Sequence, residues 1–240
     1  MIDPLHQFEI QKIFDLKIFN IDIPFTNSSL FMSLTVFCSA ILFIMGTHKK
    51  LMIPSRMQML VESLYGFIRE LIQDNIGPEG MKYFSLVLSV FLFVLFGNLL
   101  GMIPYGFTIT SHIIVTFCLA FMVFLIVVGV GLKEHGFHFF SLFLPQGAPL
   151  LMAPLLIPIE VLSFFSRPIS LSVRLFANMM AGHTILKVFA GFTVALGVFG
   201  IAPLLVNAAL MSLEFLVAIL QAYVFTILTC LYLKDAIHLH

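Results

Sequence analysis

The sequence predicts an all-α polytopic membrane protein, and its composition and the length of its apolar stretches support that fold class. Of 240 residues, 60% are hydrophobic and only 10% are charged, whereas soluble domains carry roughly 25% charged residues. Five apolar stretches reach the roughly 20 residues that a helix needs to cross a bilayer. We therefore expect one integral membrane domain over residues 1–240, with five membrane-embedded helices and one surface amphipathic helix.

The N-terminal segment is the first element along the chain, and it is not a targeting signal. Its first 22 residues mix acidic, basic and apolar side chains, without the apolar core and small-residue cleavage site of a signal peptide. We expect the chain to be inserted through its own helices. The first three predicted spans are residues 28–46, 83–100 and 108–132, with a turn at residues 101–106 between the second and third.

The amphipathic helix is predicted between the first two spans, within residues 51–76. Apolar side chains recur there at helical spacing, at Leu60, Leu64, Phe67, Ile68 and Leu71. Arginine, glutamate and aspartate residues are interspersed among them. The segment is too charged to cross a bilayer, so we expect it to lie at the membrane surface.

The last two apolar stretches, residues 150–190 and 197–233, are too long for upright spans. At 1.5 Å per residue the first would measure about 60 Å, twice the roughly 30 Å hydrocarbon thickness. Pro154, Pro158 and Pro168 allow a break in the first stretch, and a strong tilt is the alternative. Both remain open, but an upright five-helix bundle is excluded.

Lysine and arginine residues in the short connections predict the orientation. Seven fall on one side of the predicted membrane: Lys49, Lys50, Arg56, Arg69, Lys82, Lys133 and Lys234. Three fall on the other side: Lys12, Lys17 and Lys187. We therefore expect the N-terminus outside, the C-terminus inside and five segments between them.

Polar residues spaced seven apart mark the last two stretches. Glu160, Arg167 and Arg174 lie close to one helical stripe, which serines and alanines extend. The last stretch repeats the pattern with Asn207, Glu214 and Gln221. The two stretches run antiparallel, so their polar faces can meet. Intramembrane serines such as Ser163 and Ser166 equally suit plain helix packing, and Glu160 and Arg167 could reach interfacial water by snorkelling.

Arg174 is harder to explain as a packing residue, because it lies far inside its apolar stretch. Arginine near the middle of a bilayer costs from about 3 to more than ~10 kcal/mol, and intramembrane ionisable groups are functional by default. Apart from Lys187, Glu214 and His183 are the only other titratable residues that lie well inside the outer half of these stretches. A carboxylate and an imidazole can both exchange protons, whereas a guanidinium keeps its proton. The pattern indicates a fixed positive charge flanked by groups that can relay protons.

These segments resemble subunit a of the F-type ATP synthase, of the alphaproteobacterial and mitochondrial type. The resemblance rests on "FFSRPISLSVRLFANMMAGH", "LQAYVFTILTCLYLKDAIHLH" and "FGNLLGMIPYGFT", and it covers nearly the whole chain. Members of that family conduct protons through two offset half-channels, to and from the carboxylates of a c-ring. The coupled rotation of the ring drives ATP synthesis on other subunits, so the resemblance implies a stator that is not itself an enzyme.

The resemblance implies roles for particular residues and partners. Arg174 takes the position of the essential arginine that faces the c-ring carboxylates. The outer half-channel residues are His183, Glu214, Asn178, Asn207 and Gln221, and the inner ones are Glu160 and Ser170. The implied partners are the c-ring, the peripheral-stalk subunit b, the other F0F1 subunits and the lipid bilayer. The expected location is a bacterial inner membrane, with the mitochondrial inner membrane second.

Other classes of function fit the sequence less well. A proton-coupled secondary transporter is the main alternative, but transporters commonly contain internal repeats, and none is visible here. A membrane scaffold gives no reason for a charge as deep as Arg174. The zero formal net charge favours no nucleic-acid partner. Nucleotide-binding loops, metal motifs and catalytic triads are absent from the sequence, so we expect no cofactor and no metal.

Overall fold

The computed structural model describes residues 8–18, 21–47, 54–103, 106–136, 138–139 and 153–238. Five helices in these ranges are long and apolar enough to cross a membrane, which confirms the predicted fold class. The α-helices are α1 (Asn27–Thr47), α2 (Arg56–Asn75), α3 (Phe84–Gly101), α4 (Ile113–His135), α5 (Ala153–Ala195) and α6 (Ile201–Ile237). The shorter elements are β1 (Lys12–Ile18), β2 (Ile21–Thr26) and the 3-10 helices η2 (Pro78–Tyr83), η3 (Ile109–Ser111) and η6 (Gly197–Gly200).

An N-terminal β-hairpin, absent from the predicted elements, precedes the first membrane helix. β1 and β2 pair antiparallel. The Asn27 side chain ties the segment before the hairpin to the start of α1. Its Nδ2 donates to the carbonyl of Glu9 at 3.1 Å, and its Oδ1 accepts from the backbone N–H of Gln11 at 3.3 Å. Apolar and polar residues alternate at positions 14–18 and 21–26, which is the period of a strand. The sequence therefore carried a signal for this hairpin that the predicted elements left out.

The predicted amphipathic helix is confirmed as α2, and its place at a membrane surface stays a prediction. Its N-cap is Ser55, whose hydroxyl accepts a hydrogen bond from the backbone N–H of Gln58 at 3.3 Å. Ile68 of the predicted apolar face is buried, whereas Leu60 is exposed. Val61, Leu71 and Ile72 are buried as well, so the buried face overlaps the predicted one only in part, and other apolar side chains point outward.

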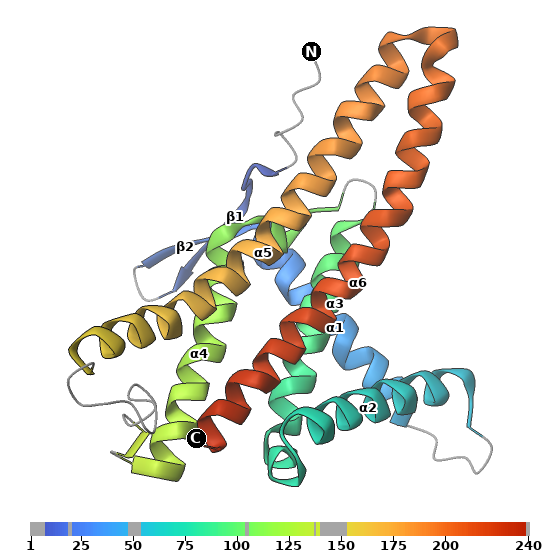
Figure 1. Cartoon of the computed structure of the whole chain (residues 1–240). Helices are drawn as coiled ribbons and strands as arrows, with labels where there is room; N and C mark the ends of the chain where they lie inside the picture. The colour runs from blue at the N-terminus through green and yellow to red at the C-terminus, as the bar shows by residue number, and fades with distance from the viewer. Residues whose placement is uncertain are drawn as a thin grey trace.

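The two long stretches form the α5–α6 hairpin, whose helices extend beyond the others in Figure 1. Although Pro158 and Pro168 lie inside it, α5 is one continuous helix of 43 residues. A break at these prolines, one of the two options left open by the sequence, is therefore wrong. At 1.5 Å per residue α5 is about 65 Å long, and it runs obliquely across α4 in Figure 1. Such a helix has to lie at an angle to remain in a hydrocarbon layer roughly 30 Å thick.

The buried core joins α2, α3, α4, α5 and α6. Its fully buried side chains include Ile68, Val94, Val123, Leu175 and Phe225, one from each of these helices. The shorter helices thus hold α5 over its middle portion and α6 over its middle and C-terminal portions. This packing fixes the positions of the polar side chains that α5 and α6 carry.

The connections lie at two ends of the molecule, as the predicted order of the spans requires. Lys82 Nζ lies 3.8 Å from Glu134 Oε1 and links η2 to the end of α4. His135, also at that end, donates from Nε2 to a carbonyl at the end of α6 at 2.8 Å. At the opposite end, Lys187 Nζ lies over the ring of Phe8, 5.7 Å from its centroid. The described parts of the first connection, the end of α4 and the C-terminal segment therefore share one side.

Candidate functional site

His183 of α5 and Glu214 of α6 meet between the two long helices. His183 Nδ1 lies 3.5 Å from Glu214 Oε1, and both side chains are buried, with exposed fractions of 8% and 5%. Gly182 makes this approach possible, because a Cβ at that position would lie 2.6 Å from Glu214 Oε1. The expectation that the two groups lie close together is confirmed. Among the described residues neither carboxylate oxygen of Glu214 has a hydrogen-bond partner.

Thr108, from the segment that joins α3 to η3, contacts the other nitrogen of the same imidazole. Its Oγ1 lies 2.9 Å from His183 Nε2 and also donates to the carbonyl of Gly101 at 3.3 Å. Thr108 is almost fully buried, and so is His183. The imidazole therefore lies between a hydroxyl on one side and a carboxyl group on the other.

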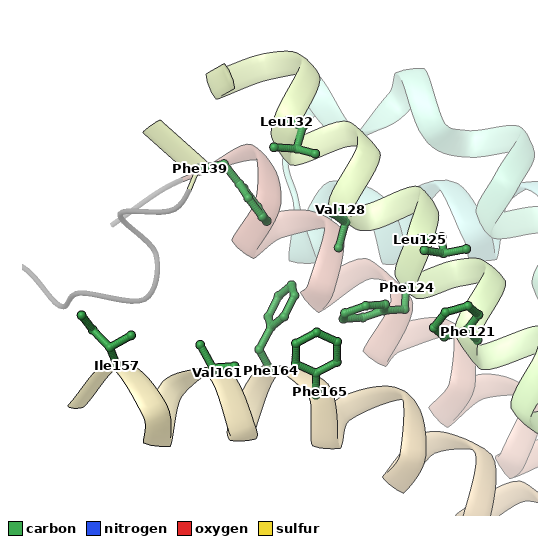
Figure 2. A pocket seen from close by; sticks show the side chains of 10 residues that line it. All are labelled: Phe121, Phe124, Leu125, Val128, Leu132, Phe139, Ile157, Val161, Phe164 and Phe165. Atoms are coloured by element: carbon green, nitrogen blue, oxygen red, sulfur yellow. The ribbon is translucent and has the colours of Figure 1, made fainter. Parts of the chain in front are cut away.

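A cavity of about 180 Å³ adjoins Glu214. Asn178 and Glu214 are the polar side chains in its wall, and aliphatic residues of α5 and α6 complete it. A larger pocket of about 650 Å³ lies between α4 and the first half of α5, and Figure 2 shows that aromatic and aliphatic side chains line it. That wall offers no group that could exchange a proton, so we place the candidate site at the smaller cavity.

Arg167 and Arg174 lie two helical turns apart on α5, in contrasting surroundings. Arg167 donates from its Nη1 to Asp235 Oδ2 at 2.7 Å, and its guanidinium lies 5.3 Å from the ring centroid of Tyr232. Arg174 is exposed and forms neither an ion pair nor a hydrogen bond with any described residue. One arginine therefore has a fixed partner in its own chain, and the other presents its charge outward.

The remaining predicted site residues are distributed along the same two helices. Asn178 lines the cavity beside Glu214. Asn207 and Gln221 of α6 are half-buried, and Asn207 Oδ1 is a buried atom without a hydrogen-bond partner among the described residues. Glu160 is half-buried and Ser170 is exposed, both between Arg174 and the start of α5. The structure thus brings Asn178, His183 and Glu214 together, and leaves Glu160 and Ser170 apart from them along α5.

The polar stripe of α5 packs against α6 less than the sequence indicated. Ser163, Ser166, Ser170 and Ala177 are all exposed, as Arg174 is. Leu171, Leu175 and Met179, on another face of α5, are buried instead. Because the core requires the apolar face of α5, most of the stripe points outward. Exposed serines do not act as packing contacts within this chain. Helix packing inside the chain therefore does not account for Ser163 and Ser166.

Several buried polar residues near the site were not among the predicted ones. Asn98 of α3 donates from Nδ2 to the carbonyl of Ala218 at 3.0 Å and accepts from Thr110 Oγ1 at 2.8 Å. Thr116 and Ser172 join α4 to α5 through their hydroxyls at 3.1 Å. The available signal was an asparagine inside an apolar run, in the same "FGNLLGMIPYGFT" segment that also contains Thr108.

These features together define a class of protein. The fold is that of a polytopic membrane protein, and two long apolar helices enclose a histidine and a carboxyl group beside an exposed arginine. Among the described residues, no group of three or more histidine, cysteine, aspartate or glutamate residues could hold a metal ion. The class is therefore that of an ion-conducting membrane protein whose polar groups suit protons.

Comparisons with known proteins identify the family. Residues 29–234 match the family model described as ATP synthase A chain. The chain is 54% identical to ATP synthase subunit a of Rhodospirillum rubrum, with 100% of both chains covered. It is 52% identical to ATP synthase subunit a of Parvibaculum lavamentivorans, over 99% of this chain and 94% of the relative. The subunit of Pelagibacter ubique is 51% identical, over 99% and 98%. The chain belongs to the family of ATP synthase subunit a, the proton-conducting and non-catalytic stator subunit of F0.

Proposed function

We propose that this chain, acting as one membrane domain, conducts protons through two offset half-channels that Arg174 separates. The outer half-channel comprises the residues near the α5–α6 hairpin, namely Asn178, His183, Asn207, Glu214 and Gln221. Glu160 and Ser170 belong to the inner half-channel, nearer the start of α5. Protons pass from the outer route to carboxyl groups on a ring of c subunits, and they leave by the inner route after the ring has turned.

The observation that carries this proposal is the contrast between Arg174 and Arg167. An arginine that serves the fold has a fixed partner, as Arg167 has in Asp235 at 2.7 Å. Arg174 is exposed and has no ion pair among the described residues. An exposed cation on an apolar helix supports a counter-charge on another subunit. A carboxylate of the rotating c-ring, which approaches Arg174 and then moves away, would provide such a counter-charge.

The chemistry of guanidinium suits the proposed role. A nearby cation favours the ionised form of a carboxyl group, so each ring carboxyl group releases its proton as it reaches Arg174. The same charge keeps protons from crossing directly between the half-channels. A direct leak would dissipate about 2.3 kcal/mol per proton for each 100 mV of membrane potential. Lysine is unsuitable, because an ammonium group in a dry site loses its proton readily.

The location and the remaining partners belong to the same proposal. The bacterial relatives support a bacterial inner membrane, with the N-terminus outside and the C-terminus inside. Besides the c-ring, the partners are the peripheral-stalk subunit b, the other F0F1 subunits and the surrounding lipid. A secondary transporter would require Arg174 to pair within this chain, most plausibly with Glu214 or Glu160. Glu214 lies against His183 instead, which argues against that alternative.

The test compares substitutions of the two arginines in the intact F0F1 complex. We expect Arg174→Ala to abolish the acidification of inverted membrane vesicles on adding ATP, and Arg174→Lys to fail almost as completely. The control is Arg167→Ala, which removes a cation of the same helix and should leave pumping measurable. Immunoblots establish that each variant subunit is present, and a gradient-decay assay detects leakage through joined half-channels. Normal pumping by Arg174→Ala would refute the mechanism.

A further inference from the structure

The hydroxyl of Thr108 has two contacts, and only one of them can use its proton. A carbonyl oxygen only accepts hydrogen bonds, so the contact with the Gly101 carbonyl at 3.3 Å requires the Thr108 hydroxyl as donor. The hydroxyl has no second proton. In the 2.9 Å contact with His183 Nε2 the nitrogen must therefore be the donor. The surroundings of Thr108 thus specify which imidazole nitrogen carries a proton.

We propose that Thr108 is a positioning residue that holds His183 in the Nε2–H tautomer, so that Nδ1 is the atom that exchanges protons with Glu214. This inference rests on the proposed outer half-channel, in which we take His183 and Glu214 to act as a proton relay. In that tautomer the lone pair of Nδ1 faces Glu214 Oε1, 3.5 Å away. When a proton passes from Glu214 to His183, the O–H bond breaks and the Nδ1–H bond forms, which leaves a carboxylate and an imidazolium. The reverse transfer restores both neutral groups.

The position of Thr108 is itself fixed by its neighbours. Ser111 donates from Oγ to the carbonyl of Thr108 at 2.6 Å. Gly101 leaves room for the hydroxyl, because a Cβ there would lie 2.5 Å from Thr108 Oγ1. A proton-transferring group works best when its orientation is set before the transfer, and the partner of the second imidazole nitrogen sets that orientation. Other ionisable groups near His183 are Glu214 and, one turn along α5, Lys187.

The direct test is the tautomer of His183 in the assembled complex. Nitrogen-15 solid-state NMR of histidine-labelled F0F1 in lipid distinguishes a protonated from an unprotonated ring nitrogen. The spectrum of His183→Gln identifies the signals of His183 by difference, since the chain has eight histidines. We expect Nε2 protonated and Nδ1 unprotonated in the unmodified complex. Thr108→Val removes the acceptor with little change of shape, and we expect the imidazole to change to the Nδ1–H tautomer.

Two matched variants separate positioning from simple structural support. Thr108→Ser keeps the hydroxyl and should keep the Nε2–H tautomer. Thr110→Val removes another buried threonine hydroxyl, which donates to Asn98 rather than to His183, and it should also leave the tautomer unchanged. If the complex with Thr108→Val fails to assemble, Gly101→Ala is used as the test variant instead, because its added methyl group displaces the same hydroxyl. An unchanged Nε2–H signal in the variant that does assemble would overturn the inference.

Proton pumping gives the second readout, which bears on the relay itself. A histidine held in the wrong tautomer transfers protons orders of magnitude more slowly in other systems, so we expect pumping by Thr108→Val to fall by about tenfold or more. Thr108→Ser should restore it. Normal pumping despite an altered tautomer would contradict the His183–Glu214 relay and still support the positioning effect of Thr108. The tautomer measurement therefore tests the positioning role of Thr108, and the pumping measurement tests the relay between His183 and Glu214.

Discussion

At the scale of single residues, the ionisable side chains of the site divide into groups whose chemistry allows proton exchange and one that keeps its proton. His183 and Glu214 lie with Nδ1 and Oε1 3.5 Å apart, away from bulk solvent. Arg174, nine residues before His183 on the same helix, is about 13 Å away along the axis. In the proposed mechanism this pair delivers protons to ring carboxyl groups near Arg174, whose permanent charge separates the two half-channels.

Exchanging His183 and Glu214 tests whether the pair acts as a relay. The double variant His183→Glu with Glu214→His keeps one imidazole and one carboxyl group in contact, so we expect it to retain part of the pumping rate. Glu214→Leu keeps the volume but removes the exchangeable proton, and we expect it to abolish most of the pumping. ATP-driven acidification of inverted vesicles measures both. Equal loss in the two variants would argue against a relay.

Glu160 should matter much less than Glu214. It lies fourteen residues before Arg174, about 21 Å along the helix axis, and it is only half-buried. A carboxylate at a channel mouth mainly raises the local proton concentration, an electrostatic effect that salt weakens. We expect Glu160→Gln to slow proton conduction without stopping it, and less so at high ionic strength. Complete loss in a fully assembled complex would contradict this role.

Contacts between single residues could be predicted from the sequence where the spacing of residues along two helices determines which side chains meet. The proximity of His183 to Glu214 followed from their places on two antiparallel helices. The contacts of Thr108 and Asn98 could not be predicted in this way. They depend on the path of the chain between α3 and α4 and on the rotation of α3 about its axis, and neither is encoded in the spacing of polar residues.

At the scale of elements, the close approach of α5 and α6 depends on a missing side chain. A Cβ at Gly182 would lie 2.6 Å from Glu214 Oε1, whereas a Cβ at Gly191 on the same helix would meet no atom within 4 Å. We expect Gly182→Ala to displace the carboxyl group from His183 and to lower pumping by about tenfold or more, since misplacement by about 1 Å can cost up to ~100-fold.

The matched control for this prediction is Gly191→Ala, which introduces the same methyl group into open space. We expect it to leave proton pumping unchanged, because it moves no neighbour. Both variants should assemble, since the end of a glutamate side chain can shift at small cost. Equal pumping by the two variants would show that the exact distance between the helices does not matter to the relay.

Helix positions were largely predictable, and the exceptions have physical causes. The first span was predicted at residues 28–46 and is Asn27–Thr47, because an uninterrupted apolar run leaves little choice. The third was predicted to start at residue 108, but α4 starts at Ile113, because hydrogen bonds of Thr108 and Ser111 favour a 3-10 turn there. The course of α5 through Pro158 and Pro168 depends on packing, which local propensity does not supply.

At the scale of the whole molecule, the two ends consist of different elements. One end holds η2, the end of α4 and the end of α6, and the other holds the N-terminal segment and the α5–α6 turn. The order of the predicted spans indicated this grouping. It could not predict how the five spans pack side by side, because many arrangements bury similar apolar area.

Cysteine labelling tests the proposed orientation. In a variant whose own cysteines, Cys38, Cys118 and Cys230, are replaced by serine, we introduce either Glu79→Cys or Leu196→Cys, both at exposed positions. We expect a membrane-impermeant maleimide to label Leu196→Cys from outside intact cells. Glu79→Cys should react in inverted vesicles instead. The reverse pattern would invert the assignment of the two half-channels.

The three side chains that meet at His183 come from widely separated parts of the chain. Thr108 follows α3, His183 lies on α5 and Glu214 on α6, so translation must reach the last helix before all three are present. A ribosome that has delivered α5 has made the arginine and the histidine but not the glutamate. The proposed outer half-channel therefore needs the final segment, and a chain that ends before α6 lacks one of its two titratable groups.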